Sequence, residues 1–262
     1  MVQKAGMASA EYLTSPLLSA AGFRHAFFTR GGGVSEGPYR SLNCSFSVGD
    51  VEGRVQTNVA RAAAALGRDA SQLVWLTQIH GRDVRVVRPG DSTEMVRHWP
   101  GDGLVTRVAW LACGVRVADC VPVLIGDRKS GIVAAVHAGW RGVVARVIEA
   151  TVSCLRADLG GPGDLVAAIG PHISVTAFEV SDDVAAALAS ASPARAVDRT
   201  RGPKPHVDLR RIVRAQLCEV GVPDDQVDDV PGCTVGDRER FFSFRRDGPR
   251  SGRHLAAIVP GG

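Results

Sequence analysis

Residues 103–136 read GLVTRVAWLACGVRVADCVPVLIGDRKSGIVAAV, and four apolar segments follow one another within them. These segments are 103–106, 111–117, 121–125 and 131–136, and they are rich in the β-branched residues that favour strands. Too few residues separate them for a helix to fit between consecutive strands, so a simple Rossmann alternation of strand and helix is a poor match. The pattern predicts a mixed α/β fold, of the α+β type, in which sheets are layered and flanked by helices.

The sequence on either side of this stretch alternates between further strand and helix patterns. We expect strands over 23–29, 73–79 and 83–87. We expect helices over 51–66, 141–159, 182–191 and 208–220, with Asp50 and Asp208 capping the first and the last. Residues 192–205, with three prolines, are expected to form an exposed loop, and residues 1–20 to be poorly ordered. No repeat or linker divides the chain, so all 262 residues are predicted to form one domain.

The composition excludes several classes of protein. The chain is 45% hydrophobic with a net charge of +4, but its 31 basic residues are interspersed with 27 acidic ones and form no unbroken run. This pattern argues against nucleic acid as a partner. No apolar run approaches the roughly 20 residues that span a bilayer, and no secretory signal is evident. Six scattered cysteines without a CxxC motif indicate reduced thiols, so we expect a cytoplasmic protein. The sequence leaves its oligomeric state open.

Three metal-capable residues fall at the predicted ends of strands. His80, Cys120 and His137 each stand beside a Gly or Pro turn, where the backbone can approach a ligand closely. Two imidazoles and a thiolate suit Zn²⁺ with a fourth position open to water, and copper could compete. Each residue also has a purely structural interpretation, and Cys120 with either histidine would equally suit a cysteine hydrolase. The residues alone leave these alternatives open.

Six motifs in this order resemble one known family. They are TQIHG, DGLVT, ADCVPVLI, AAVHAGWRG, IGPHISVTAFEV and CTVGDRERFFSFRRDGPRSGR, and they span about residues 23–259. These motifs are similar to those of the YfiH family, the laccase-domain or "polyphenol oxidase" proteins, which are also called peptidoglycan editing factors. The resemblance implies a YfiH-like single domain with one metal on His80, Cys120 and His137.

The same resemblance implies an activity and a set of partners. It implies zinc-dependent phosphorolysis of adenosine, inosine and methylthioadenosine to base and ribose 1-phosphate, with adenosine deamination as a companion activity. The expected partners are a small-molecule nucleoside and phosphate, with no nucleic acid and no membrane. Two further functions stay open, a cysteine-dependent hydrolase or amidase editing a peptidoglycan precursor and a weak copper-dependent phenol oxidase. A metal-binding partner protein without turnover is a third alternative.

Four other residues are candidates for substrate contacts. Arg246 would clamp phosphate through its planar guanidinium, and the sequence leaves open whether Arg246 or the adjacent Arg245 faces the site. Arg30 could meet an anion beside the Gly31–Gly33 turn. Asn43 matches a family position and could bind the sugar or base, whereas Asp119 could carry a proton or orient a ligand. Each of the four also has a structural interpretation: surface ion pairing, a flexible turn, a turn Asn or support of a ligand.

The histidine count tests the laccase label. A multicopper oxidase needs roughly ten histidines, many in His-x-His pairs, whereas this chain has seven and none in such a pair. The His-x-Glu and Pro-Cys-x-x-Cys motifs of zinc nucleobase deaminases are absent as well. Two positions depart from the family pattern, with Ser47 where many members have His and His172 where Cys is frequent. Both departures bear on substrate preference.

Overall fold

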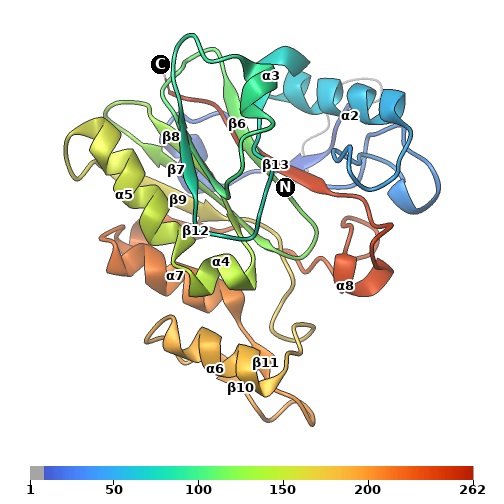
Figure 1. Cartoon of the computed structure of the whole chain (residues 1–262), viewed down its shortest axis with the longest axis vertical. Helices are drawn as coiled ribbons and strands as arrows, with labels where there is room; N and C mark the ends of the chain where they lie inside the picture. Colours follow the sequence, from blue (N-terminus) through green and yellow to red (C-terminus); the bar gives the residue numbers. More distant parts are fainter. Residues whose placement is uncertain (1–8, 262) are drawn as a thin grey trace.

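Two β-sheets lie face to face in the computed structural model, which describes residues 9–261 (Figure 1). The first sheet has the strand order β1-β2-β13-β6-β3, formed by Tyr12–Leu13, His25–Phe28, His254–Ile258, Ala112–Val117 and Leu73–Val74. The second has the order β12-β9-β7-β8-β5-β4, formed by Val227–Asp229, Leu165–Ile169, Val121–Asp127, Val133–Ala138, Gly103–Thr106 and Val84–Val87. Both sheets contain parallel and antiparallel pairs.

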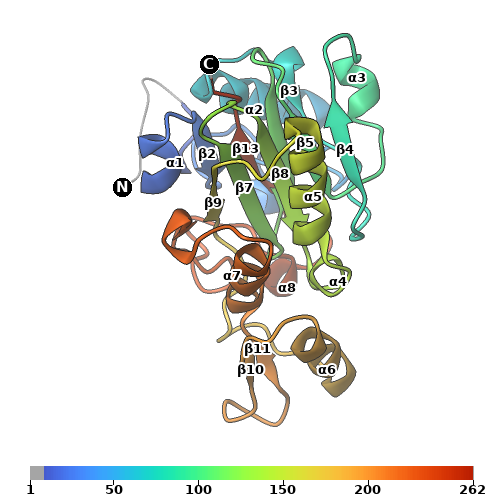
Figure 2. The same cartoon turned by 90° about the vertical axis from the view of Figure 1, so that its left-hand side faces the viewer.

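Helices cover the outer faces of the two sheets and one end of the molecule. They are α1 (Pro16–Ala20), α2 (Glu52–Ala65), α3 (Thr93–Val96), α4 (Trp140–Val144), α5 (Val147–Leu159), α6 (Asp182–Ser190), α7 (Leu209–Glu219) and α8 (Phe244–Asp247). Short 3₁₀ turns occur at Gly37–Tyr39, Ala70–Gln72 and Asp224–Gln226. A hairpin of β10 (Val197–Asp198) and β11 (His206–Val207) lies beside α6 at the lower end in Figure 2.

Alternation of side chains along the strands explains the layers. In β7, Val123 and Ile125 face the helices, whereas Leu124 faces the other sheet. In β13, Ala256 contributes to the core between the sheets, whereas Leu255 packs on the side of α2. Because successive strand residues point to opposite faces, apolar runs of this kind suit strands that are covered on both sides.

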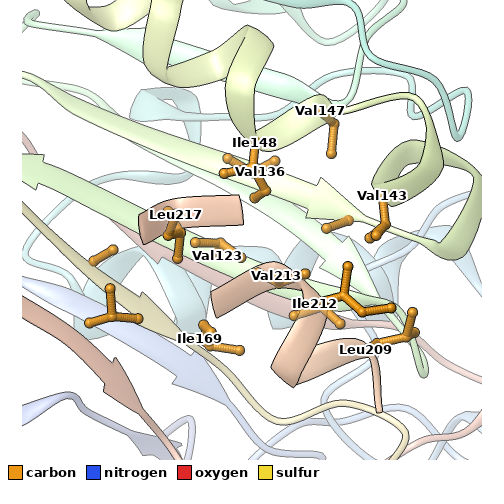
Figure 3. Packing of buried hydrophobic residues seen from close by; sticks show 14 of the residues in the cluster. Val123, Val136, Val143, Val147, Ile148, Ile169, Leu209, Ile212, Val213 and Leu217 are labelled. Atoms are coloured by element: carbon orange, nitrogen blue, oxygen red, sulfur yellow. The ribbon is translucent and has the colours of Figure 1, made fainter. Parts of the chain in front are cut away.

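Helices α5 and α7 pack against the six-stranded sheet. Figure 3 shows Ile148 of α5 and Ile212 of α7 lying over Val123 and Val136, and all four belong to one buried apolar cluster. On the far side of the molecule, α2 packs against the five-stranded sheet through an apolar stripe that includes Val55. The result is a helix–sheet–sheet–helix arrangement, and it confirms the mixed α/β class predicted from the sequence.

Two predicted helix features are wrong. The helix expected over 141–159 is two helices, because Arg146 between them adopts a left-handed backbone conformation with φ of 66°. Its guanidinium binds Glu149, Glu219 and the carbonyl of Ala191, which hold the break. Asp50 does not cap α2, because one of its carboxylate oxygens accepts hydrogen bonds from Ser35 and Asn43.

Other elements differ from expectation at their ends. Asp208 caps α7 as predicted, and its side chain accepts from the backbone N–H of Arg211. The strand expected over 73–79 is only Leu73–Val74, and the loop expected over 192–205 contains β10. Strands β9 and β13, of five residues each, are not among the strands expected from the sequence.

The described part of the N-terminal segment contains one short strand and one short helix. Residues 9–20 contain β1 and α1, and Leu18 of α1 is fully buried. The remainder of the expectation for residues 1–20 falls on residues 1–8, which lie outside the described residues. None of the helices within residues 9–261 combines the length and apolar character needed to cross a bilayer.

Candidate metal centre

A cavity of about 610 Å³ opens where loops from both sheets meet. Its lining contains all three predicted metal ligands. The lining residues are Ser45, Ser47, Thr77, Gln78, His80, Arg116, Val117, Ala118, Asp119, Cys120, His137, Ile173, Phe178, Phe244, Arg245 and Arg253. A volume of this size falls in the range typical of small-molecule sites.

His80 lies in the loop that follows β3 rather than at the end of a strand. The backbone of His80 is left-handed, with φ of 58°. Hydrogen bonds of Asp102 and Gln78 hold this loop in place. Asp102 accepts hydrogen bonds from the backbone N–H groups of His80 at 3.0 Å and of Gly81 at 2.7 Å. The side-chain amide of Gln78 both donates to and accepts from the backbone of Arg116, at 2.8 Å each, and so joins the loop to β6.

Cys120 lies in the turn between β6 and β7, directly before a strand and not at its end. The preceding Asp119 has φ of 94°, an uncommon conformation for a residue with a side chain. Its two carboxylate oxygens accept from the Thr234 hydroxyl at 2.6 Å and the Arg245 backbone N–H at 2.6 Å. Asp119 therefore fixes the turn that carries Cys120 to the segment around α8.

His137 is buried near the end of β8, as predicted. Its Nδ1 donates a hydrogen bond to Oδ1 of Asp102 at 2.7 Å, so Nε2 is the ring nitrogen that would bind a metal ion. The rings of His80 and His137 meet edge to face with centroids 4.8 Å apart. One ligand atom from each of His80, Cys120 and His137 lies within 4.8 Å of the other two.

Cys120 and His137 stabilise opposite charges on each other. Burial would raise the pKa of Cys120, but the charges and hydrogen bonds of His137 and His80 lower it. Burial would lower the pKa of His137, but Cys120 and Asp102 raise it. The lowered pKa of Cys120 favours the thiolate, which is the form of cysteine that binds metal ions. The raised pKa of His137 favours the imidazolium, so a metal ion would displace a proton from this ring.

Gly139 leaves the space that these side chains need. A Cβ at this position would lie 3.1 Å from Sγ of Cys120 and 3.2 Å from Cδ2 of His80. The backbone thus approaches the three ligands as closely as a residue without a side chain allows. Two imidazoles, a thiolate and a tight backbone cradle fit a single metal ion with an open position toward the cavity. Within residues 9–261 this is the one group of three such side chains.

The structure does not bring Arg246 or Arg30 to this cavity. The Arg246 guanidinium donates to the carbonyls of Thr234, Val235 and Phe241 and pairs with Asp247, so its donors are already used. The Arg30 guanidinium donates to the carbonyls of Arg40 and Arg238 and lies over Phe242 beside a separate hollow.

Asn43 is also a structural residue in this fold. It is fully buried, it donates to Asp50 and the carbonyl of Ser45, and it accepts from the backbone N–H of Arg253. Of the four candidates for substrate contacts, Asp119 alone lines the cavity. Of the two departures from the family pattern, Ser47 lines the cavity, whereas His172 lies outside its lining.

Sequence reasoning missed several residues that build the site. Asp102, Arg116, Arg253 and Gln78 are outside the predicted set, although Gln78 and Asp102 stand in the motifs TQIHG and DGLVT. A polar residue inside an otherwise apolar or glycine-rich motif is the sequence signal that would have identified them. Arg116 interrupts the apolar strand β6 in the same way, and its guanidinium lies over the ring of Trp75.

Comparison with known proteins places the chain in a family. Residues 24–260 match a family model described as multi-copper polyphenol oxidoreductase laccase. A Bacteroides thetaiotaomicron protein named purine nucleoside phosphorylase is 35% identical over 253 residues, covering 93% of each chain. A Shigella flexneri protein named purine nucleoside phosphorylase YfiH is 41% identical over 220 residues, covering 84% of this chain and 86% of that protein.

A solved structure supports the same grouping. The crystal structure of YlmD from Geobacillus stearothermophilus superposes with a TM-score of 0.89 at 31% identity, covering 100% of this chain and 99% of that one. The match to the family model and the identity to the relatives extend over nearly the whole chain. The chain therefore belongs to the YfiH family, whose model is described as multi-copper polyphenol oxidoreductase laccase.

Proposed function

We propose that this protein is a zinc-dependent purine nucleoside phosphorylase, which cleaves adenosine, inosine or methylthioadenosine and deaminates adenosine as a companion activity. The observation that carries the proposal is a three-residue metal set that opens into a cavity of about 610 Å³ instead of being closed by a fourth protein ligand. An open position is the arrangement of catalytic zinc sites. Two relatives named purine nucleoside phosphorylase give the activity its support.

The reaction makes one bond and breaks another. An oxygen of phosphate bonds to C1′ of the ribose while the C1′–N9 bond breaks, and its electron pair passes to the purine, which takes up a proton as it leaves. A metal ion on His80, Cys120 and His137 would supply positive charge that stabilises negative charge developing in the cavity.

The chain's own residues bind and orient the reactants. Phe178 and Phe244 line the cavity and offer aromatic faces to a purine. Thr77 lines it as well and offers a hydroxyl group to the ribose. Asp119 positions the turn of Cys120 through two short hydrogen bonds, and because both its carboxylate oxygens are occupied, we assign it a positioning role rather than proton transfer.

A phosphate-dependence assay tests the proposal. The protein is purified without added metal, its zinc and copper are measured, and release of hypoxanthine from inosine is followed with phosphate, with arsenate and with neither. We expect stoichiometric zinc and base release that requires phosphate or arsenate and disappears in Cys120→Ser. Cys154→Ser, a partly exposed cysteine of α5 outside the cavity lining, is the matched control. Stoichiometric zinc without phosphate-dependent base release would contradict the proposal.

A cysteine-dependent hydrolase or amidase is the second candidate. The lowered pKa of Cys120 beside His137 would also suit a nucleophile and its base. This function requires a metal-free protein that an alkylating substrate analogue labels at Cys120. Phenol oxidation by one loosely held copper is a lesser proposal, because seven histidines cannot build the several copper centres of a multicopper oxidase.

A further inference from the structure

The cavity contains more positive than negative charge. Among the described residues that line it, three are arginines and one is a carboxylate. Asp119, the carboxylate, is already hydrogen-bonded to Thr234 and to the backbone of Arg245. Nη1 of Arg245 donates to the carbonyls of Ala177 and Glu179, and its guanidinium lies over the ring of Phe178. Arg116 and Arg253 are the pair of lining arginines in which the positive charge of one lowers the pKa of the other.

Arg116 lies in β6, and Arg253 is the residue directly before the neighbouring strand β13. Arg116 of β6 stands opposite Leu255 of β13 in the antiparallel ladder, and Arg253 is two residues before Leu255. Residues two apart on one strand point to the same face, so the two arginines are diagonal neighbours across the pair. This register brings two guanidinium groups to the same wall of the cavity.

Within the described part of the chain neither arginine forms an ion pair with a carboxylate, although the charges of Cys120 and Asp119 raise the pKa of Arg253 against the effect of burial. The Arg116 guanidinium stacks on Trp75, 5.1 Å from the ring centroid, and makes no side-chain hydrogen bond there. Arg253 donates to the carbonyls of Ser251 and Gly252 and lies over the ring of Phe244. By contrast, arginines elsewhere, such as Arg214, are paired with carboxylates.

Burial and mutual repulsion make these charges costly without a ligand. Burial lowers the pKa of Arg116 to about 10, and the positive charges of Arg253 and Arg97 act in the same direction. Burial is also the largest effect on Arg253 and lowers its pKa. A buried charge is stabilised when an opposite charge and hydrogen bonds replace the lost water.

We propose that Arg116 and Arg253 form an oxyanion subsite that binds inorganic phosphate beside His80, Cys120 and His137. The inference rests on the proposed phosphorolysis and identifies where its co-substrate binds. The planar fork of a guanidinium offers paired donors to a tetrahedral oxyanion, and Ser45 and Ser47 supply hydroxyl groups on the same lining. The subsite takes the role that sequence reasoning gave to Arg246.

Phosphate binding to the zinc-loaded protein tests the subsite without turnover. Isothermal titration with phosphate, in the absence of nucleoside, is carried out on the wild type, Arg116→Gln and Arg253→Gln, with zinc content and circular dichroism checked for each. We expect each variant to bind phosphate about ten- to hundredfold more weakly, because each loses charge-assisted hydrogen bonds. Arg116→Lys, which keeps the charge without the fork, is expected to lie between the wild type and Arg116→Gln.

Initial rates separate this role from a general loss of structure. In the variants the KM for phosphate should rise by the same factor, whereas the KM for inosine should change little. Arg199→Gln is the control, because Arg199 is an exposed arginine paired with Asp182 outside the cavity lining. Unchanged phosphate affinity in both Arg116→Gln and Arg253→Gln, with zinc and fold retained, would overturn the subsite.

The subsite and the proposed function can fail separately. Arginine-dependent phosphate binding without any base release from nucleosides would support the subsite and contradict the phosphorylase. The oxyanion could also be the phosphate group of a nucleotide, so inosine 5′-monophosphate is titrated in parallel. If it binds far more tightly than phosphate, in an arginine-dependent way, and is the compound that is turned over, the assignment to free phosphate is overturned.

Discussion

Oδ1 of Asp102 accepts a hydrogen bond from Nδ1 of His137 at 2.7 Å, and the same atom accepts one from the backbone N–H of His80 at 3.0 Å. The backbone carbonyl of Asp102 accepts a further bond from the N–H of His137. One buried residue therefore sets the position of two candidate ligands that are 57 residues apart in the chain. Support of this kind fixes the tautomer of a histidine ligand and its orientation toward a metal.

Replacement of Asp102 should weaken metal binding. In Asp102→Asn the side chain loses its charge, and the amide group cannot satisfy both His137 and the backbone of the His80 loop. Loss of such a partner typically lowers metal affinity about 10- to 100-fold. We expect zinc affinity, measured by competition with a chelator, to fall in that range.

A second buried aspartate provides the control for Asp102. Asp127 is 1% exposed and accepts from Ser130 and the backbone of Asp164, at a turn outside the cavity lining. Asp127→Asn should lower stability while leaving zinc affinity unchanged. Equal zinc affinity in Asp102→Asn and the wild type would show that Asp102 does not support the metal centre.

Gly139→Ala should damage the centre by crowding it. The added Cβ would lie 3.1 Å from Sγ of Cys120 and 3.2 Å from Cδ2 of His80, so at least one ligand must move. We expect lower zinc occupancy by elemental analysis and reduced base release. Gly53→Ala is the matched control, because its Cβ would meet no atom within 4 Å in helix α2. That control should gain about 0.5–1 kcal/mol of stability. Full zinc occupancy in Gly139→Ala would contradict the crowding argument.

Local sequence patterns predicted most of the strands and helices, but they did not predict the residues that hold the candidate ligands in place. The strands from Gly103 to Ala138 and the cap at Asp208 follow from side-chain period and capping chemistry, which act over a few residues. The break at Arg146 depends on Glu219, 73 residues away, and no local pattern contains that information. Likewise, the role of Asp102 depends on the pairing of β5 with β8, which places it beside His137.

The candidate site divides in the same way. His80, Cys120 and His137 were identifiable because metal ligands are chemically distinctive and stand in motifs with Gly and Pro turns. The arginines were not, because 28 arginines are spread along the chain and their chemistry alone does not select one. The register of β6 with β13 selects Arg116 and Arg253, and that register is a property of the tertiary fold.

Arg246→Ala should reduce stability and leave phosphate binding intact. The guanidinium donates to three backbone carbonyls and pairs with Asp247, so its removal leaves these acceptors with lost hydrogen bonds. We expect the free energy of unfolding to fall by about 1–3 kcal/mol, measured by urea titration. The KM for phosphate should stay at the wild-type value. A large rise in that KM with unchanged stability would return the phosphate-clamp role to Arg246.

His254 should make the protein sensitive to acid. Its Nε2 accepts a hydrogen bond from the backbone N–H of Phe242 at 2.8 Å, and this acceptor is lost on protonation. Burial and, to a smaller extent, the charges of Arg30, Arg253 and Arg246 lower the pKa of His254 to about 3, against the opposing effect of its hydrogen bond to the backbone of Val117. The unfolded chain therefore binds a proton near pH 6.5 that the folded chain does not bind until about pH 3. The stability that this histidine contributes is complete above pH 6.5 and decreases as the pH falls from 6.5 toward 3.

The slope of stability against pH measures this effect. Between pH 6 and pH 4.5, one such histidine contributes a loss of about 1.4 kcal/mol per pH unit. The glutamine side chain of His254→Gln keeps an oxygen acceptor for the backbone N–H of Phe242 but does not titrate. As the pH falls, the free energy of unfolding of this variant should therefore decrease less steeply than that of the wild type, by about 1.4 kcal/mol per pH unit. His98→Gln, at an exposed histidine, is the control and should keep the wild-type slope. His25 and His172 also have lowered pKa values because of burial, so His254→Gln should retain part of the slope. Equal slopes in His254→Gln and the wild type would mean that the folded protein protonates His254 as readily as the unfolded chain does.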